Sequence, residues 1–345
     1  MEDLRSPESL IDAIVAAPDD DAPRMVYADW LQERGDPRGE LIALQCRPAL
    51  FESDVFERAW RLEHEHGARW LAPLRELVTD PGPLHFVRGF VERIQLDAAD
   101  WIKNGERLCA LTPLREIELR RVESLAEVLA APATARVRSI EVRAQVLDNA
   151  RVGKLDHVPP LPRLDSLALL ELRLSGVAVH ALGELRAAPR SLYLDRNPAC
   201  SAGLHGVLGS PFAARLERLG LDYVTLGSDL STFEQVAGTL RTLAADHCDL
   251  AGDALAQIVT RVPLEELSAA ATRDIDDATL AALARCASLR VLRLRGCGLA
   301  ITPHGLRDML RALPQLATLD LRECGLRKTE YGRTLARFPD ACGWS

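Results

Sequence analysis

The stretch Leu289–Leu299 reads LRVLRLRGCGL, and twenty-seven residues later Leu316–Leu326 reads LATLDLRECGL. Both stretches place leucine at the first, fourth, sixth and eleventh positions, and both end in Cys-Gly-Leu. Alternation of apolar and polar residues is typical of a half-buried β-strand, so each stretch predicts one short strand followed by a turn. The chain therefore contains an internal repeat to which the rest of the sequence can be aligned.

The repeat extends over most of the chain. Aligning its first position along the sequence gives ten starts, which follow one another at intervals of 23 to 27 residues. Apolar residues at helical spacing fill the intervals, as in GDALAQIVTRV and PHGLRDMLRAL, so each copy predicts one strand and one helix. The ten starts are Val91, Leu114, Val137, Leu164, Pro189, Leu216, Leu240, Leu264, Leu289 and Leu316.

This pattern resembles the leucine-rich repeat, in the longer form of the ribonuclease-inhibitor type. The resemblance covers residues 88–327 and implies an α/β fold, a horseshoe-shaped solenoid of about ten strand–helix repeats. Position nine of each copy is expected to turn inward and bond peptide groups that lack a partner. We therefore expect a structural role for the residues at this position, which are Asn197, Cys248, Thr272, Cys297 and Cys324.

Two parts of the array are irregular. Within residues 161–179, LPRLDSLAL predicts a copy that starts at Leu164, whereas LLELRLSGV predicts one that starts at Leu169. The first frame is preferred because the Leu-Pro pair that precedes it also precedes the last copy. The stretch 144–160 is longer than its counterparts, and we expect it to bulge from the solenoid.

Residues 328–345 predict a C-terminal cap, because a terminal copy of a repeat lacks a neighbour on one side. The segment RKTEYGRTLARF has the apolar spacing of one last helix. We expect Tyr331, Leu335 and Phe338 to cover the end of the core.

Residues 1–80 predict a small all-α domain of four helices. The first spans residues 7–17 with Ser6 as its N-cap, and the others are RMVYADWLQER, ELIALQ and the longer stretch 55–77. An ion pair of Arg24 with Asp29 or Asp36 is expected to fix the first hairpin. The side chains of the second helix that are expected to face the first are Met25, Val26, Trp30 and Leu31.

Part of this domain resembles the bacterial repeat-companion domain, a short N-terminal module that accompanies leucine-rich and other repeats. The segment AIVAAPDDDAPRMVYADWLQERGDPRGELIALQ carries the resemblance over residues 8–46. It implies an association with repeat arrays and no known reaction. The matching residues are Ala13, Ile14, Pro18, Asp20, Asp21, Arg24, Tyr27, Ala28, Asp29, Trp30, Leu31, Gly35, Asp36, Pro37, Gly39, Glu40 and Gln45.

Charge and composition exclude several classes of function. Of the net charge of −8, the whole excess lies in residues 1–90, which hold 18 acidic and 10 basic side chains, whereas residues 91–345 hold 32 of each. Neither part is typical of a protein that binds a nucleic-acid backbone. The sequence has no run of about eighteen apolar residues, so we expect no membrane span. Its acidic start and eight unpaired cysteines favour a cytoplasmic protein with reduced thiols.

No signature of a reaction is found. The sequence lacks GxxxxGK, GxGxxG, GxSxG, HExxH and paired CxxC motifs, so we expect neither an enzyme nor a cofactor. His64 and His66 are two residues apart, unlike the i, i+4 pair of a helical zinc site. The acidic run 19–21 favours helix capping over a metal ion. We expect no metal site.

The candidate partner-binding residues lie on the strand face. Positions three, five and seven alternate with the buried leucines and are expected to line the concave side. At position seven, three aspartates on adjacent strands form an acidic ladder, which costs stability unless a partner or solvent offsets the repulsion. Arginines gather on the last two copies. The candidate residues are Tyr193, Asp195, Asp222, Asp246, Arg293, Arg295, Asp320 and Arg322.

These features predict a bacterial protein-binding module, an adaptor or scaffold that uses charge complementarity on its concave face to choose a partner protein. One alternative is a regulatory or sensor subunit that controls a partner enzyme. A second is an unrecognised enzyme with a site in the helical domain. The identity of the partner is not encoded in any motif.

Overall fold

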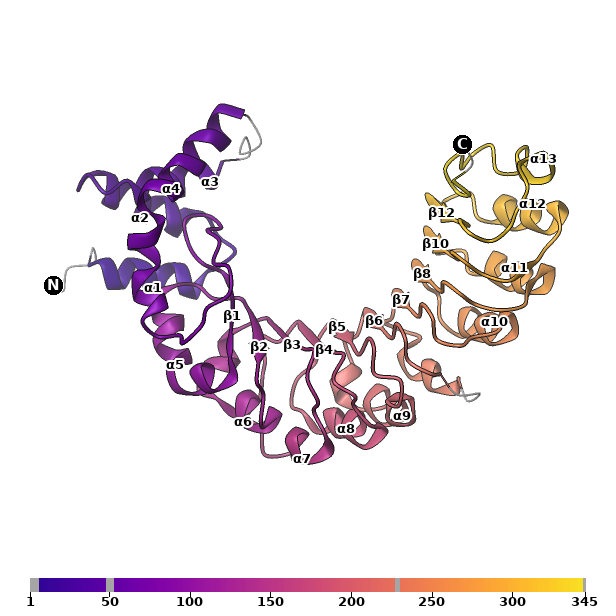
Figure 1. Ribbon diagram of the computed structural model, residues 1–345, viewed down its shortest axis with the longest axis horizontal. Helices are drawn as coiled ribbons and strands as arrows, with labels where there is room; N and C mark the ends of the chain where they lie inside the picture. Colours follow the sequence, from indigo (N-terminus) through magenta and orange to yellow (C-terminus); the bar gives the residue numbers. More distant parts are fainter. Residues whose placement is uncertain (1–5, 48–52, 227–229, 344–345) are drawn as a thin grey trace. The chain divides into compact units, whose positions relative to one another are not determined.

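The computed structural model describes residues 6–47, 53–226 and 230–343, and the chain divides into two compact units, 1–141 and 142–345 (Figure 1). The first unit begins with four helices, each within two residues of the predicted bounds. Ser6 caps the first helix, since its Oγ accepts a hydrogen bond from the N–H of Ser9 at 3.2 Å. The helices are α1 (Pro7–Ala16), α2 (Ala22–Gln32), α3 (Arg38–Gln45) and α4 (Ser53–Arg75).

One apolar cluster joins these helices to the segment that precedes the first strand. The prediction for Val26 is wrong: its side chain is 56% exposed, because α2 turns the next two residues, Tyr27 and Ala28, toward the core. The buried members of the cluster are Leu10, Ile14, Tyr27, Ala28, Leu31, Ile42 and Phe90.

The predicted ion pair of Arg24 is also wrong. Arg24 lies on the buried face of α2 with an exposure of 0%, so it needs a buried partner, and the exposed Asp29 is not one. Its Nη2 instead lies 2.7 Å from Oε1 of Glu92, just before β1. Arg88 binds the same carboxylate oxygen at 2.7 Å. The helices and the first strand are thus joined by a buried charge network.

The rest of the first unit alternates strands and helices as the repeat predicts. β1 (Arg93–Asp97) and β2 (Glu116–Arg120) are parallel and pair with Ile94 opposite Ile117. β3 (Ser139–Arg143) follows at the boundary of the two units. The helical segments between them are α5 (Ala98–Leu111), α6 (Leu125–Ala130) and the 3-10 helix η1 (Pro132–Arg136).

The second unit is built on parallel strands that occur in chain order. Each strand begins at the third position of a predicted copy, and Ser166 pairs with Ser191, which confirms the frame that starts at Leu164. A short second sheet pairs β9 (Ile275–Asp276) with β11 (Leu299–Ala300). The main strands are β4 (Ser166–Leu170), β5 (Ser191–Tyr193), β6 (Arg218–Gly220), β7 (Thr242–Ala244), β8 (Glu266–Ser268), β10 (Val291–Arg293) and β12 (Thr318–Asp320).

Helices and 3-10 turns of this unit lie along one side of the strands (Figure 1). Leucines at the fourth and sixth positions fill the space between the two layers, and Leu192, Leu243 and Leu292 are almost fully buried. Each such side chain stabilises the fold by about 1.5–3 kcal/mol. The helical segments are α7 (Asn149–Val152), α8 (Gly176–Ala181), η2 (Leu182–Glu184), η3 (Ser201–Gly203), α9 (Leu204–Leu208), η4 (Pro211–Ala213), η5 (Ser231–Val236), α10 (Gly252–Arg261), α11 (Asp277–Arg285), α12 (Pro303–Ala312) and α13 (Lys328–Tyr331).

Position nine bonds the backbone, as the repeat predicts. Asn197 is fully buried. Its Oδ1 accepts hydrogen bonds from the N–H groups of Leu172 and Leu174, each at 3.0 Å. Its Nδ2 donates to the carbonyls of Leu169 and Leu194, each at 2.8 Å. Thiols take the same place in later copies. Those of Cys248, Cys297 and Cys324 donate to the carbonyls of Leu221, Ala269 and Leu294 at 2.9, 3.3 and 2.9 Å.

Two irregular parts differ from their predictions. The stretch 144–160 contains α7 and packs Val152, Leu155 and Val158 into the interior, so apolar side chains anchor this longer connection. The last helix, α13, is shorter than predicted because the chain then turns and the carbonyl of Ala341 accepts the N–H of Leu321 at 2.7 Å.

The three predicted capping side chains are nevertheless buried: Tyr331, Leu335 and Phe338. The Tyr331 hydroxyl donates to the carbonyl of Ile301 at 2.7 Å. No helix in the described part of the chain has the length and apolar character to cross a membrane.

Candidate partner-binding site

The three predicted acidic residues of position seven form a ladder that is bonded to the backbone. Oδ1 of Asp195 accepts the N–H of Asp222 at 2.9 Å, and Oδ1 of Asp222 accepts the N–H of Asp246 at 2.8 Å. Oδ1 of Asp246 accepts the N–H of Ala270 at 2.7 Å and the Ser268 hydroxyl at 2.8 Å. Each carboxylate therefore satisfies a peptide group of the following copy, just beyond its strand, which offsets the repulsion expected between like charges.

Burial governs the electrostatics of this ladder. It raises the pKa of Asp195 to about 6, and the neighbouring Asp222 carboxylate adds to the effect. Burial also raises the pKa of Asp222, with repulsion from Asp246 as a further cause. The ladder is thus only partly open to a partner, and one oxygen of each carboxylate is committed to the fold.

The predicted basic cluster is largely paired within itself. Arg322 binds Asp320 through two hydrogen bonds, of 2.9 and 2.6 Å, and these hold the pKa of the Asp320 carboxyl below its usual range. Arg295 forms an ion pair with Glu323. Arg293 is exposed, and within the described part of the chain no ion pair holds it. The cluster therefore offers a partner mixed charge instead of a strongly basic surface.

Tyr193 lies half-buried on β5, opposite Gly220 on β6. A Cβ atom added at Gly220 would lie 2.6 Å from Cδ1 of Tyr193 and 2.8 Å from Oδ1 of Asp195. The glycine leaves room for the tyrosine ring and the first carboxylate of the ladder. Tyr193 and Asp195 are thus brought together, whereas the arginines lie several copies further along the chain.

A row of side chains at position eight, most of them exposed, was not predicted as part of the site. In the second unit these residues adopt a left-handed backbone, with φ between 54° and 62° although they are not glycine. In LRVLRLRGCGL this position is occupied by Gly296, with φ of 67°. This glycine is the one feature of the sequence that indicates a left-handed backbone at position eight. The other members of the row are Ala144, Glu171, Arg196, Tyr223, His247, Ala271 and Glu323.

Three of these side chains form a continuous stack. The Arg196 guanidinium lies 4.6 Å from the centre of the Tyr223 ring. The rings of Tyr223 and His247 are stacked with centres 4.6 Å apart and an angle of 12° between their planes. Tyr223 is 42% exposed. A bulky residue in the left-handed region is an uncommon choice, and such residues cluster at functional sites.

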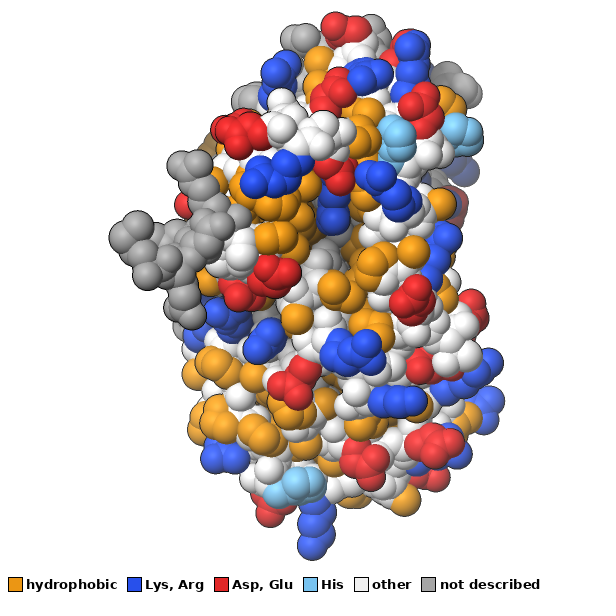
Figure 2. All heavy atoms as spheres, turned by 90° about the vertical axis from the view of Figure 1, so that its left-hand side faces the viewer, with side chains coloured by type: hydrophobic (Ala, Val, Ile, Leu, Met, Phe, Trp, Pro, Cys, Tyr) orange, Lys and Arg blue, Asp and Glu red, His pale blue; other side chains and the backbone are white. Residues whose placement is uncertain are grey.

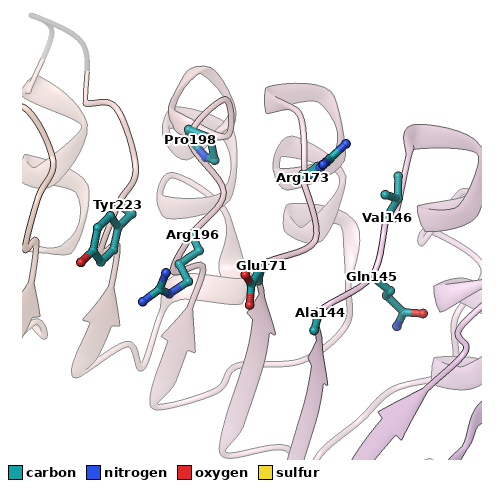
Figure 3. Close-up of a pocket in the computed structure, with 8 residues that line it drawn as sticks. All are labelled: Ala144, Gln145, Val146, Glu171, Arg173, Arg196, Pro198 and Tyr223. Atoms are coloured by element: carbon teal, nitrogen blue, oxygen red, sulfur yellow. The ribbon is translucent and has the colours of Figure 1, made fainter.

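Two members of the stack, Arg196 and Tyr223, line a groove of about 620 Å³ (Figure 3). Most of the lining side chains come from positions eight and ten of neighbouring copies, and Gln145 comes from position nine. Arg196 lies between Tyr223 and Glu171 in this view. The lining residues are Ala144, Gln145, Val146, Glu171, Arg173, Arg196, Pro198 and Tyr223.

The helices of the first unit carry a different kind of surface. Trp60 and Phe56 on α4 are more than half exposed, but blue and red side chains are interspersed over the described part of the face drawn in Figure 2. Ion pairs such as that of Arg58 with Glu40, at 2.6 Å, neutralise many of them. Of the acidic residues predicted to cap α2, Asp20 accepts the N–H of Ala22 at 2.9 Å, whereas Asp19 binds Arg115 and Arg138.

Among residues 6–47, 53–226 and 230–343, no group of three or more His, Cys, Asp or Glu side chains is arranged to hold a metal ion. Burial raises the pKa of several thiols, for example those of Cys200 and Cys248 to about 12. Such thiols stay protonated at neutral pH and are poor nucleophiles.

No protein-family model and no curated protein matches the chain. Among solved structures, the crystal structure of the Rad7 and Elc1 complex in yeast aligns with a TM-score of 0.47 and 14% identity, over 93% of this chain and 88% of the other. A protein from Bacteroides fragilis aligns with a TM-score of 0.37 and 13% identity, over 62% and 67%. At this level of similarity neither neighbour assigns a function.

Proposed function

We propose that the chain is a non-catalytic protein-binding module, an adaptor or scaffold of the leucine-rich-repeat type with a repeat-companion domain at its N-terminus. The observation that carries the proposal is the exposed stack of Arg196, Tyr223 and His247. Tyr and Arg are the side chains most enriched at the energetic centres of protein interfaces. Here they are already ordered, which lowers the entropy lost when a partner binds.

The predicted residues take different roles in this proposal. Tyr193 lies on the strand face and adds aromatic surface to that of the stack. The aspartates of the ladder hold strands in register and present their second oxygen to a partner. Arg293, Arg295, Asp320 and Arg322 form a mixed-charge rim, where a contact influences the rate and orientation of association more than its affinity.

The test is affinity capture from the native bacterial host with wild-type protein and a Tyr223→Asn/His247→Asn variant. Asparagine tolerates the left-handed backbone, so the double variant keeps the turns while it removes both rings. The matched control is Ala271→Asn, which places the same residue at the same position of the next copy.

Partners that the wild type and the control capture equally, and that the double variant loses, support the proposal. Equal recovery of the same proteins by all three contradicts it. Circular dichroism of each protein verifies that the fold is retained.

A further inference from the structure

The groove beside the stack has two rows of side chains that run in a defined direction. Across neighbouring copies, position eight presents Ala144, Glu171, Arg196 and Tyr223, and position ten presents Val146, Arg173 and Pro198. The rows follow the direction in which strands succeed one another, with hydrogen bonds between copies such as that from the N–H of Glu171 to the carbonyl of Asp195 at 3.0 Å. The groove thus runs across the copies, along the edge where the strands end.

The length of the groove suits an extended peptide. Four copies span three strand spacings of about 4.8 Å, or about 14 Å, and an extended chain advances by about 3.3 Å per residue. About four residues of a partner therefore fit along it. Apolar side chains of Ala144, Val146 and Pro198 provide surface for a small apolar residue.

The charges of the groove favour an acidic occupant. Among the described residues, no ion pair holds Arg173 or Arg196, and Glu171 is the one acidic side chain of the lining. Arg196 interacts at longer range with the ladder carboxylates of Asp195 and Asp222, each of which already accepts a peptide N–H. The face of the Arg196 guanidinium rests on Tyr223, which leaves its N–H edge available. A planar guanidinium held in this way binds a carboxylate through two parallel hydrogen bonds.

We infer that this groove binds an extended, acidic segment of the partner protein, with one Asp or Glu side chain on Arg196. The inference rests on the proposed function and specifies its chemistry. Arg173 adds a second positive charge. Glu171, one copy before Arg196, repels a second acidic residue at that point and so fixes the direction in which the segment lies.

The experiment uses a phage-displayed library of random twelve-residue peptides, selected on the immobilised full-length chain. Enriched sequences are synthesised with a fluorescent label, and their dissociation constants are measured by fluorescence polarisation. The protein variants are Arg196→Gln, Glu171→Gln and Arg307→Gln, the last an exposed arginine on α12 that serves as the control.

We expect enriched peptides to share an Asp or Glu flanked by apolar residues. Arg196→Gln should weaken binding about tenfold, Glu171→Gln should strengthen it about threefold, and Arg307→Gln should leave it unchanged, since 1.4 kcal/mol corresponds to a factor of ten. Replacing the shared acidic residue of the peptide by its amide should match the loss caused by Arg196→Gln.

Three results overturn the inference: no enriched peptide, enriched peptides without an acidic residue, or equal affinity for wild type and Arg196→Gln. Failure here is distinct from failure of the proposed function. If the host partner is still lost by the Tyr223→Asn/His247→Asn variant, the stack binds a protein by a chemistry other than carboxylate recognition.

Discussion

Nη2 of Arg24 and Oε1 of Glu92 lie 2.7 Å apart although 68 residues separate them in the chain, and the arginine is completely buried. Arg88 and Arg115 also bind this glutamate. A buried charge that loses its partner is far more costly than an exposed one. This carboxylate therefore links the helices to the first strand in addition to the apolar cluster that contains Phe90.

Replacing Arg24 by alanine should lower the free energy of unfolding by about 3–5 kcal/mol, because it removes a buried ion-pair partner. Arg58→Ala, which breaks the exposed pair with Glu40, should cost less than about 1 kcal/mol. Urea denaturation followed by circular dichroism measures both. Equal costs for the two variants would show that the buried network does not stabilise the fold.

The aspartate ladder predicts a difference between alanine and asparagine. Asp246→Ala leaves the N–H of Ala270 without its acceptor and should cost about 1–3 kcal/mol. Asp246→Asn keeps an oxygen at the same place and should cost clearly less. Thermal unfolding of the two variants at neutral pH makes the comparison, and a larger loss for asparagine would contradict the bonding role.

Stability should depend on pH through Asp195. Its pKa in the folded protein is raised to about 6 from its ordinary value of 3.8, so the folded state holds the proton more tightly than the unfolded state. This contribution is fully present below about pH 4 and is lost as pH rises to about 6. Asp195→Asn should therefore gain stability over wild type as pH rises from 4 to 7. Chemical denaturation at several pH values tests this, and a gap between the two proteins that does not change with pH contradicts it.

The buried amide of position nine should matter more than the thiols that replace it elsewhere. Asn197→Ala removes four hydrogen bonds to buried peptide groups and should cost at least about 3 kcal/mol. Cys248→Ala removes weaker thiol bonds and should cost less than about 2 kcal/mol. The midpoints of urea unfolding rank the two, and the reverse order is the result that counts against this account.

The left-handed backbone at position eight predicts a substitution that stabilises the fold. Ala271 has φ of 60° and belongs to no stack, so Ala271→Gly should raise the free energy of unfolding by about 0.5–1 kcal/mol. Tyr223→Gly relieves the same strain but removes the contacts with Arg196 and His247, so its gain should be smaller. A melting temperature that falls for Ala271→Gly would contradict the assignment of strain.

Much of the fold could be predicted because each copy of the repeat has the same spacing of leucines. The leucine spacing located the strands of the main sheet in the second unit, but not the short pair β9 and β11. The inward turn at position nine followed from the need to satisfy buried peptide groups. Arg24 could not be placed in this way. Its partner, Glu92, lies outside the helices, and local spacing carries no information on such a distant contact.

The site was harder to predict than the fold. Alternation along a strand identifies position seven as exposed, but it does not reveal that Asp195 and Asp222 each bond the next strand. Nor does it reveal the row at position eight, because the left-handed turn breaks the alternation on which the prediction depends. Gly296 in the opening stretch was the only residue that indicated this left-handed turn. One glycine, with other residue types at the same position of the remaining copies, was too weak a pattern to predict the row.

The aspartate ladder also bears on how such a chain can change length during evolution. Each aspartate serves the copy that follows it, from Asp195 to Asp222 to Asp246, and Asp246 also accepts the Ser268 hydroxyl of the next copy. A duplicated copy that carries aspartate at its seventh position can therefore be inserted between two of them with every bond remade. A copy without it interrupts the series, so gene duplication within this stretch is constrained at a single codon per copy.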